Sequence, residues 1–95
     1  MKYINWNNEK NKQLKEERKL SFEDVLYYIE NEKILDIIMH PNEERYKNQK
    51  IFIIEIEAYV YLIPFVENNE EIFLKTIIPS RKMTKRYLGE FHEEK

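Results

Sequence analysis

Two neighbouring β-rich runs, residues 49–57 and 59–67, constrain the fold of this chain more than any other feature. Only Glu57-Ala58 joins them, so we expect two strands connected by a tight turn. The segment Tyr59-Val60-Tyr61-Leu62-Ile63 is apolar on both faces, which predicts a strand covered on both sides. Pro64 has no backbone N–H, and it predicts an edge, a bulge or an unpaired ladder position.

Two helices are expected before this hairpin. Asn7-Asn8 supplies N-cap candidates for a mostly polar helix that ends near Lys19 and has Leu14 as its apolar anchor. Ser21 opens a capping-box-like pattern. Four apolar residues then recur at helical spacing and predict a helix face packed on a sheet, namely Phe22, Val25, Leu26 and Ile29. Residues 2–6 and 33–40 are expected to be strands, and the latter ends at a proline.

The last third of the chain combines a predicted strand, residues 72–79, with a basic helix that follows it directly. Between Ile72 and Gly89 there is no acid but there are five cations, Lys75, Arg81, Lys82, Lys85 and Arg86. A helical projection places the last four on one arc and Met83, Tyr87, Leu88 and Phe91 on the opposite arc. We therefore expect the helix to dock by its apolar arc and to present its cations outward.

The connecting segments are polar. Residues 41–48 form a long loop for which we expect a role beyond turning. Asn68 and Asn69 lie in the next turn, where asparagine tolerates positive φ better than other side chains.

The composition limits the possible classes. Ninety-five residues allow one domain spanning residues 1–95, and the element order predicts an α+β fold with a mainly antiparallel sheet of about four strands. The chain has no cysteine and only two histidines, so no metal site or other cofactor is expected. The longest apolar run is too short for a membrane span, and no signal peptide is recognisable, so we expect a cytoplasmic protein that does not contact a membrane.

The functional groups that remain suit metal-free cleavage of RNA, in which the 2′-hydroxyl is the nucleophile. Arg81 and Lys82 are candidates for stabilising the phosphate, and Glu67 or His40 for moving protons. Arg45 and Tyr46 are candidates for binding a phosphate or stacking on a base. The remaining cations of the last third, Lys75, Lys85 and Arg86, are candidates for steering RNA.

Five short segments in the same order resemble the BrnT family of toxins from type II toxin–antitoxin systems. Trp6-Asn7-Asn8-Glu9-Lys10-Asn11 resembles the family's W-D-x-x-K-x segment, and residues 18–25 resemble K-H-G-V-S-F-E-E-A. Glu44-Arg45-Tyr46 matches E-E-R-[WY], Phe65-Val66-Glu67 corresponds to [YH]-T-E-R, and residues 75–84 to R-I-I-S-A-R-[RK]-A-T. The chain departs from these patterns at several positions, which include Leu20, Asn68, Pro79 and Lys82.

The resemblance implies a RelE-like fold and an endoribonuclease that inhibits translation by acting on RNA, either free or on the ribosome. It also implies a ribbon-helix-helix antitoxin partner similar to BrnA, through which operator DNA is bound. Two other hypotheses remain open. One is a catalytically weak or inactive toxin-like module that docks an antitoxin or nucleic acid. The other is a purely structural interaction protein.

Overall fold

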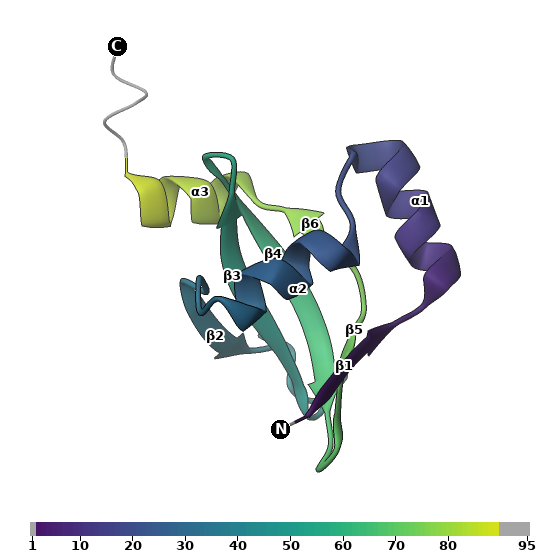
Figure 1. The fold of residues 1–95 in the computed structure, drawn as a ribbon. Coiled ribbons are helices and arrows are strands. Elements are labelled where there is room, and N and C mark those ends of the chain that lie inside the picture. Colours follow the sequence, from purple (N-terminus) through teal and green to yellow (C-terminus); the bar gives the residue numbers. More distant parts are fainter. Residues whose placement is uncertain (1, 90–95) are drawn as a thin grey trace.

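A computed structural model describes residues 2–89, in which helices and strands alternate in an α+β arrangement (Figure 1). The elements are β1 (Tyr3–Trp6), α1 (Asn8–Arg18), α2 (Phe22–Glu30), β2 (Asp36–Met39), β3 (Gln49–Ile56), β4 (Tyr59–Glu67), β5 (Glu71–Leu74), β6 (Ile78–Pro79) and α3 (Arg81–Leu88). The expected α+β class is confirmed. The expectation of about four strands was too low, because the described residues form a six-stranded sheet.

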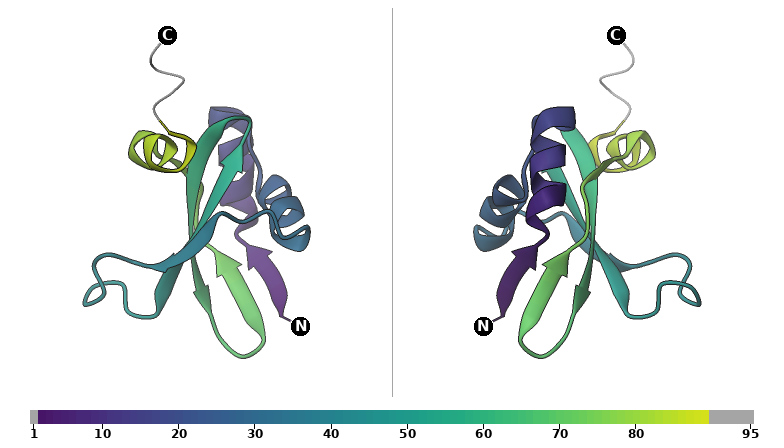
Figure 2. Two further views of the ribbon diagram at one scale, coloured as in Figure 1. Left: turned by 90° about the vertical axis from the view of Figure 1, so that its left-hand side faces the viewer. Right: turned by 90° about the vertical axis from the view of Figure 1, so that its right-hand side faces the viewer.

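The sheet is mixed. Its strand order is β1-β5-β4-β3-β2, and β6 pairs with β4 beyond the end of β5. β1 runs parallel to β5, and the other pairs are antiparallel. Helices α1 and α2 lie on one face of the sheet, whereas α3 lies on the opposite face (Figure 2). The central strands are therefore covered on both faces, as the apolar segment at the start of β4 predicted.

Strand alternation divides the core into two clusters. On the α1/α2 face, Leu14, Phe22 and Val25 pack with Phe52, Ile54, Ile56, Ile63, Phe65, Leu74 and Ile77. On the α3 face, a smaller cluster of Ile51, Ile53 and Val60 packs against Met83, Tyr87 and Leu88. The inward arc predicted for the basic helix is confirmed for these three residues, and Phe91 lies outside the described residues.

The predicted helix starts are confirmed. The Asn7 side chain accepts a hydrogen bond from the Lys10 N–H at 2.9 Å. Ser21 and Asp24 form a reciprocal capping box, with hydrogen bonds of 3.2 and 2.9 Å. A further cap was not foreseen: Asn11 of α1 is buried, and its side-chain oxygen accepts the Phe22 N–H at 2.7 Å. One polar side chain of α1 thus holds the start of α2.

The β3–β4 turn and the β4–β5 turn are stabilised in different ways. Glu57 and Ala58 both have positive φ, 54° and 65°, which produces the tight β3–β4 turn that the sequence predicted. The positive φ expected for Asn68 and Asn69 is wrong. The Asn68 side-chain oxygen instead accepts the backbone N–H groups of Glu70 and Glu71, each at 2.8 Å. This turn is therefore stabilised by an asparagine side chain rather than by left-handed backbone.

Pro64 interrupts the ladder between β4 and the chain that returns beside it. β5 pairs with residues 65–67 of β4, and β6 pairs with residues 61–62, so residues 75–77 oppose residues 63–64. Pro64 contributes only its C=O, which accepts the Lys75 N–H at 2.8 Å. The expected single strand over residues 72–79 is therefore split into β5 and β6 by a bulge of one extra residue. Pro64 thus lies in a central strand, where it pairs with Ile51 of β3 on one side and faces a bulge of the returning chain on the other.

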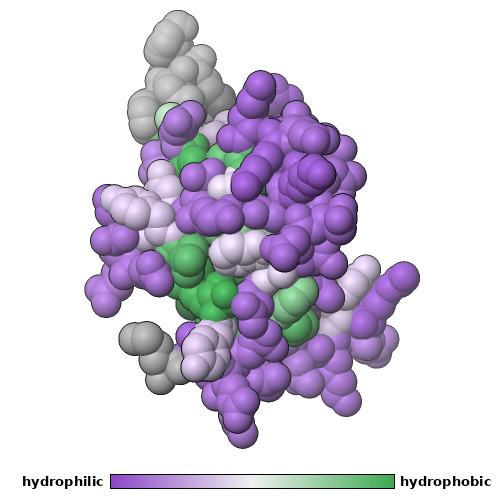
Figure 3. All heavy atoms as spheres, turned by 45° about the vertical axis from the view of Figure 1, so that its right-hand side comes forward, coloured by the Kyte–Doolittle hydropathy of each residue, from purple (hydrophilic) through white to green (hydrophobic). Residues whose placement is uncertain are grey.

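The sheet is incompletely covered at its two edges, β2 and β1. β2 is shorter than expected, and Ile37 and Met39 on this edge strand are about half exposed, at 49% and 47%. Hydrophilic side chains cover α1, whereas a hydrophobic patch lies between α2 and β1 (Figure 3).

Within residues 2–89, each helix is too short and too polar to cross a membrane.

Candidate nucleic-acid interface

The cationic face of α3 results from the spacing of its residues. Met83, Tyr87 and Leu88 occupy the side that packs on the sheet. Arg81, Lys82, Lys85 and Arg86 are exposed. Because the sequence from Ile72 to Gly89 has no acid, the helix itself provides no carboxylate to neutralise them. The predicted division into an apolar and a cationic side is thus present in the described part of the helix.

Two hydroxyl side chains fix α3 on the sheet. Ser80 is the N-cap of the helix, and its Oγ accepts the Met83 N–H at 3.1 Å. Thr84 is buried; its hydroxyl donates to the Ser80 carbonyl at 2.7 Å and accepts the Val60 N–H at 2.9 Å. The Ser80 N–H donates in turn to the Val60 carbonyl at 3.0 Å. These bonds join the first turn of α3 to the start of β4, so the direction in which the cations project is fixed by the sheet.

Three cations of α3, namely Arg81, Lys82 and Arg86, are free of ion pairs within residues 2–89. The ion pairs in that part of the chain join Lys2 and Lys50 to Glu67, and Lys15 to Glu23. Unpaired surface cations attract a polyanion, and each phosphate they neutralise releases a counterion. Arginine also binds two phosphate oxygens at once, which lysine does not.

The loop that follows β2 brings together three of the predicted residues. The rings of His40 and Tyr46 are stacked, with centroids 4.2 Å apart, and the Arg45 guanidinium lies 5.6 Å from the Tyr46 ring centroid. The Asn42 N–H donates to His40 Nδ1 at 3.1 Å. Since a backbone N–H is always the donor, neutral His40 must carry its proton on Nε2. His40 therefore offers a hydrogen-bond donor to a ligand, while Tyr46 and Arg45 offer a ring and a cation.

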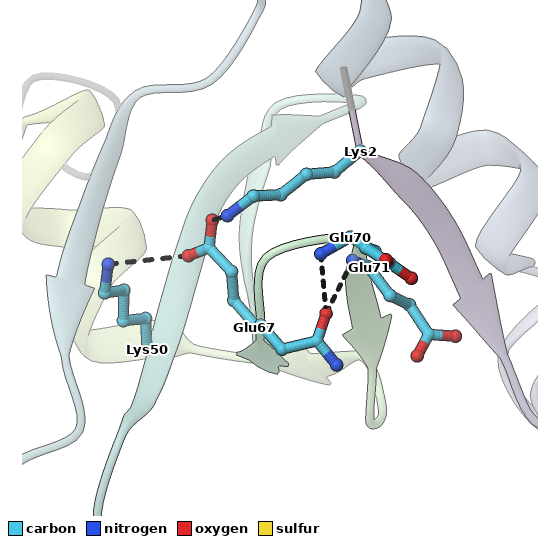
Figure 4. A network of polar contacts seen from close by, with 6 residues as sticks. Lys2, Lys50, Glu67, Glu70 and Glu71 are labelled. Carbon is cyan, nitrogen blue, oxygen red and sulfur yellow. Dashed lines mark hydrogen bonds and ion pairs between the residues drawn. The ribbon is translucent and has the colours of Figure 1, made fainter.

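Glu67 lies in a different environment, at the far end of β4. Its carboxylate accepts a hydrogen bond from Lys2 and a second one, of 3.5 Å, from Lys50 (Figure 4). The hydrogen bond from Lys2 lowers the pKa of Glu67 below its ordinary value; the charges of Lys2 and Lys50 act in the same direction, and burial acts against them. A carboxylate held in this way is a poor base. By pairing with Lys2 and Lys50, Glu67 joins the start of β1 and the start of β3 to the end of β4, and we call this arrangement the clamp.

The predicted catalytic residues are not brought together. Arg81 and Lys82 follow β6 and lie near Val60 at the start of β4, whereas Glu67 is the last residue of that strand. At the usual rise of a strand, about 24 Å separates the two ends. His40 lies two strands away from Glu67. Side chains alternate along β2, and Asp36 and Ile38 face α3, so the His40 side chain also lies on the α3 face. Glu67 instead faces Ile29 of α2. The two proton-transfer candidates thus lie on opposite faces of the sheet.

The cationic helix and the loop nevertheless project from the same side of the sheet, at opposite ends (Figure 2). Lys75 lies between them along β4, because its N–H bonds the Pro64 carbonyl. Its ammonium group lies 5.8 Å from the Phe73 ring centroid. The exposed side of the sheet therefore runs from α3, past Lys75, to His40, Arg45 and Tyr46. We call this surface, which is defined by these residues and not by a cavity, the cationic trough.

Sequence reasoning missed the two lysines that hold Glu67. Lys50 was predictable in part, since a tight turn at Glu57-Ala58 places Phe65 opposite Lys50, and Glu67 is the next residue on that face. Lys2 was not, because it reaches Glu67 only through the parallel pairing of β1 and β5. Within the described residues, no group of histidine, aspartate and glutamate side chains is arranged to bind a metal ion. His92 lies outside those residues.

Comparison of the chain with family models, curated proteins and solved structures found no match.

Proposed function

We propose that this chain is a toxin-like protein that binds single-stranded RNA along the cationic trough and thereby inhibits translation. The observation that carries the proposal is the cationic face of α3, which has no acid of its own and is held in place by Ser80 and Thr84. The net charge of the chain is −2, so attraction for a polyanion has to be local to such a surface.

The trough suits a flexible single strand. Along β4 the two ends are about 20 Å apart, because His40 pairs with Gln49 opposite Val66, six residues from Val60. This is the length of several nucleotides, and single-strand-binding proteins combine cations with aromatic stacking over such a span. In this arrangement Arg81, Lys82 and Arg86 bind phosphates near one end. Lys85, on the same helix, and Lys75 steer the backbone. Tyr46 stacks on an unpaired base, and His40 Nε2–H and Arg45 bind the next phosphate.

The type II toxin assignment remains part of the proposal. The order of one strand, two helices, antiparallel strands and a basic helix agrees with the order that the resemblance to BrnT toxins implies. A RelE-like fold, a ribbon-helix-helix antitoxin that covers the trough, and operator binding through that antitoxin follow from the same resemblance. A short ribbon-helix-helix reading frame beside the gene is the expected accompaniment.

Endoribonuclease activity is a second candidate function, which the closeness of His40, Arg45 and Tyr46 favours. In this reaction the 2′-hydroxyl loses its proton to a base and attacks phosphorus, and the 5′-oxygen leaves with a proton. The products end in a 2′,3′-cyclic phosphate and a 5′-hydroxyl. Neutral His40 has its proton on Nε2 and accepts the Asn42 N–H at Nδ1, so only the imidazolium form, which gives up that hydrogen bond, can protonate the leaving oxygen. Glu67 takes no part, because it lies on the other face of the sheet.

The binding proposal is tested with a fluorescein-labelled, 12-nucleotide single-stranded RNA of mixed sequence, titrated at several salt concentrations. Arg81→Ala/Lys82→Ala should weaken binding tenfold or more at low salt and flatten the log Kd against log salt slope by about 1.4. The matched control is Lys12→Ala/Arg18→Ala, which removes the same charges from exposed positions on α1. The wild-type protein and both double variants are also added to a cell-free translation system, and the protein it synthesises is measured.

Equal affinity of both double variants for RNA would end the proposal, as would unchanged translation with saturating wild-type protein. The cleavage candidate is decided separately by gel analysis of the products. Wild-type protein should release 2′,3′-cyclic phosphate ends that His40→Asn does not. RNA that remains intact at saturation leaves binding as the function and removes the cleavage candidate.

A further inference from the structure

The sheet has an open edge at β1 that lies beside the least covered part of α2. β1 is the terminal strand, and within residues 2–89 it pairs only with β5. The Tyr3 N–H donates to the Glu70 carbonyl at 2.9 Å, so the backbone of Tyr3 faces β5. Because backbone direction alternates along a strand, the N–H and C=O of Ile4 face away from the sheet. An extended chain can pair with these groups.

A groove of about 670 Å³ runs along this edge. β1 provides Ile4, and α2 provides Leu26 and Ile29. Leu26 and Ile29 belong to the apolar stripe that the sequence predicted to be core, yet both are only half-buried, whereas Phe22 and Val25 of the same stripe are completely buried. The C-terminal half of α2 thus exposes apolar side chains beside an unpaired strand edge (Figure 3). Such a combination is characteristic of protein interaction sites.

The charges around the groove indicate the sign of its partner. Glu30 and Glu32 are exposed at its rim, and α2 contains no basic residue. Two lysines lie nearby, but Lys2 is paired with Glu67, and the Lys33 ammonium lies 5.8 Å from the Tyr27 ring centroid. The rim is therefore negative around an apolar floor. It differs from the cationic trough, which lies on the opposite face of the sheet.

From these observations we infer that the groove between β1 and α2 binds an extended segment of another protein in which apolar residues and lysine or arginine occupy every second position, so that both kinds of side chain face α2. The segment adds a strand to β1, which satisfies the outward backbone groups of Ile4. Its apolar side chains enter the groove against Leu26 and Ile29, and its cations face Glu30 and Glu32. This inference does not depend on RNA binding, because it uses none of the residues of the trough.

The test uses the full chain and an acetylated and amidated octapeptide, Ser-Val-Ser-Lys-Ser-Ile-Ser-Lys, in which the apolar residues and the lysines share one strand face. Trp6 in β1 is the only tryptophan, so its emission reports binding directly. We expect saturable binding in the micromolar range. Peptides with glutamate in place of lysine, or with alternate backbone nitrogens methylated, should bind at least tenfold more weakly, because they lose the charge attraction or the strand pairing.

Glu30→Lys/Glu32→Lys should weaken peptide binding about three- to tenfold, as expected for two surface charge pairs. Its matched control, Glu16→Lys/Glu17→Lys, makes the same charge change at exposed positions of α1, which belong neither to the groove nor to the trough, and should leave peptide affinity unchanged. RNA affinity of Glu30→Lys/Glu32→Lys should remain within the range of the control, which separates this inference from the proposed function.

Three results would overturn the inference. The first is absence of peptide binding by a protein whose thermal unfolding is cooperative. The second is equal binding of the N-methylated peptide, which would exclude strand addition. The third is sedimentation showing a dimer that the peptide dissociates, since a second copy of the chain would then be the occupant.

Discussion

The two ends of the β3–β4 hairpin both carry cations, but they differ in what surrounds them. At the Glu67 end, Lys2 and Lys50 share one carboxylate, which cancels one of their two charges. At the α3 end, Arg81 and Lys82 project from a helix without acids. A count of cations would not distinguish these regions. The position of a single glutamate makes one end a structural clamp and leaves the other available to a polyanion.

The ends also differ in how their cations are held. Lys2 and Lys50 are flexible side chains fixed by their ion pairs, whereas α3 is fixed by backbone and hydroxyl hydrogen bonds through Val60, Ser80 and Thr84. Breaking the clamp at the Glu67 end should therefore free charges without moving an element. Breaking the contacts of Thr84 should loosen the element that carries the charges.

The largest effect is expected from Thr84→Val. This change leaves the buried Val60 N–H without a partner and should lower the free energy of unfolding by about 1–3 kcal/mol. Urea unfolding measures the loss. The control is Thr76→Val, because Thr76 is half-buried and makes no hydrogen bond within residues 2–89. Equal loss in both variants would show that the hydroxyl of Thr84 does not hold α3.

Glu67→Gln tests directly whether the glutamate causes the difference between the ends. Removal of its charge frees Lys2 and Lys50 as a second cationic site on the face opposite the trough, so RNA affinity should rise about two- to fivefold at low salt, the range of an exposed ion pair. Fluorescence anisotropy with the labelled RNA measures the change. Glu23→Gln, which frees Lys15 on the α1/α2 side, is the control. A fall in RNA affinity on Glu67→Gln would contradict the comparison.

The stability of the protein at acid pH should also depend on Glu67. The pKa of Glu67 is lowered in the folded state, so its contribution to stability is present above the unfolded pKa and is lost as pH falls through the folded one. Wild-type protein should therefore lose more stability than Glu67→Gln between about pH 5 and about pH 3. Thermal unfolding across this interval measures the difference. Parallel pH profiles for the two proteins would show that the clamp adds no stability.

The smallest effect is expected at the α3 end, from Tyr87→Phe. The Tyr87 hydroxyl donates to Asp36 of β2 at 3.1 Å, and burial, followed by the bond to Asp36, raises the pKa of Tyr87. A raised pKa contributes stability that is present below the unfolded pKa and is lost as pH rises. Wild-type protein should thus lose slightly more stability than Tyr87→Phe above about pH 10. Urea unfolding at about pH 8 and about pH 11 measures the difference, and an equal loss in both proteins would contradict it.

Local features of the fold were readable because neighbouring residues determine them. Asn7 and Ser21 cap helices through bonds within the first turn, and Glu57-Ala58 sets the hairpin. The two sides of α3 follow from helical spacing alone. These patterns depend on separations of three or four residues, and the sequence displays them directly.

The tertiary structure decided the rest through contacts between distant segments. The bulge opposite Pro64 reverses the alternation of the chain, so that Leu74 and Ile77 both reach the α1/α2 core and α3 leaves on the other face. Parallel pairing of β1 with β5 brings Lys2 to Glu67 across the length of the sequence. The length of β4 then separates Glu67 from Arg81. The sequence by itself determined which residues carry charge and which sides of the helices are apolar. Only register and strand order, which depend on long-range pairing, decided which of those charges meet.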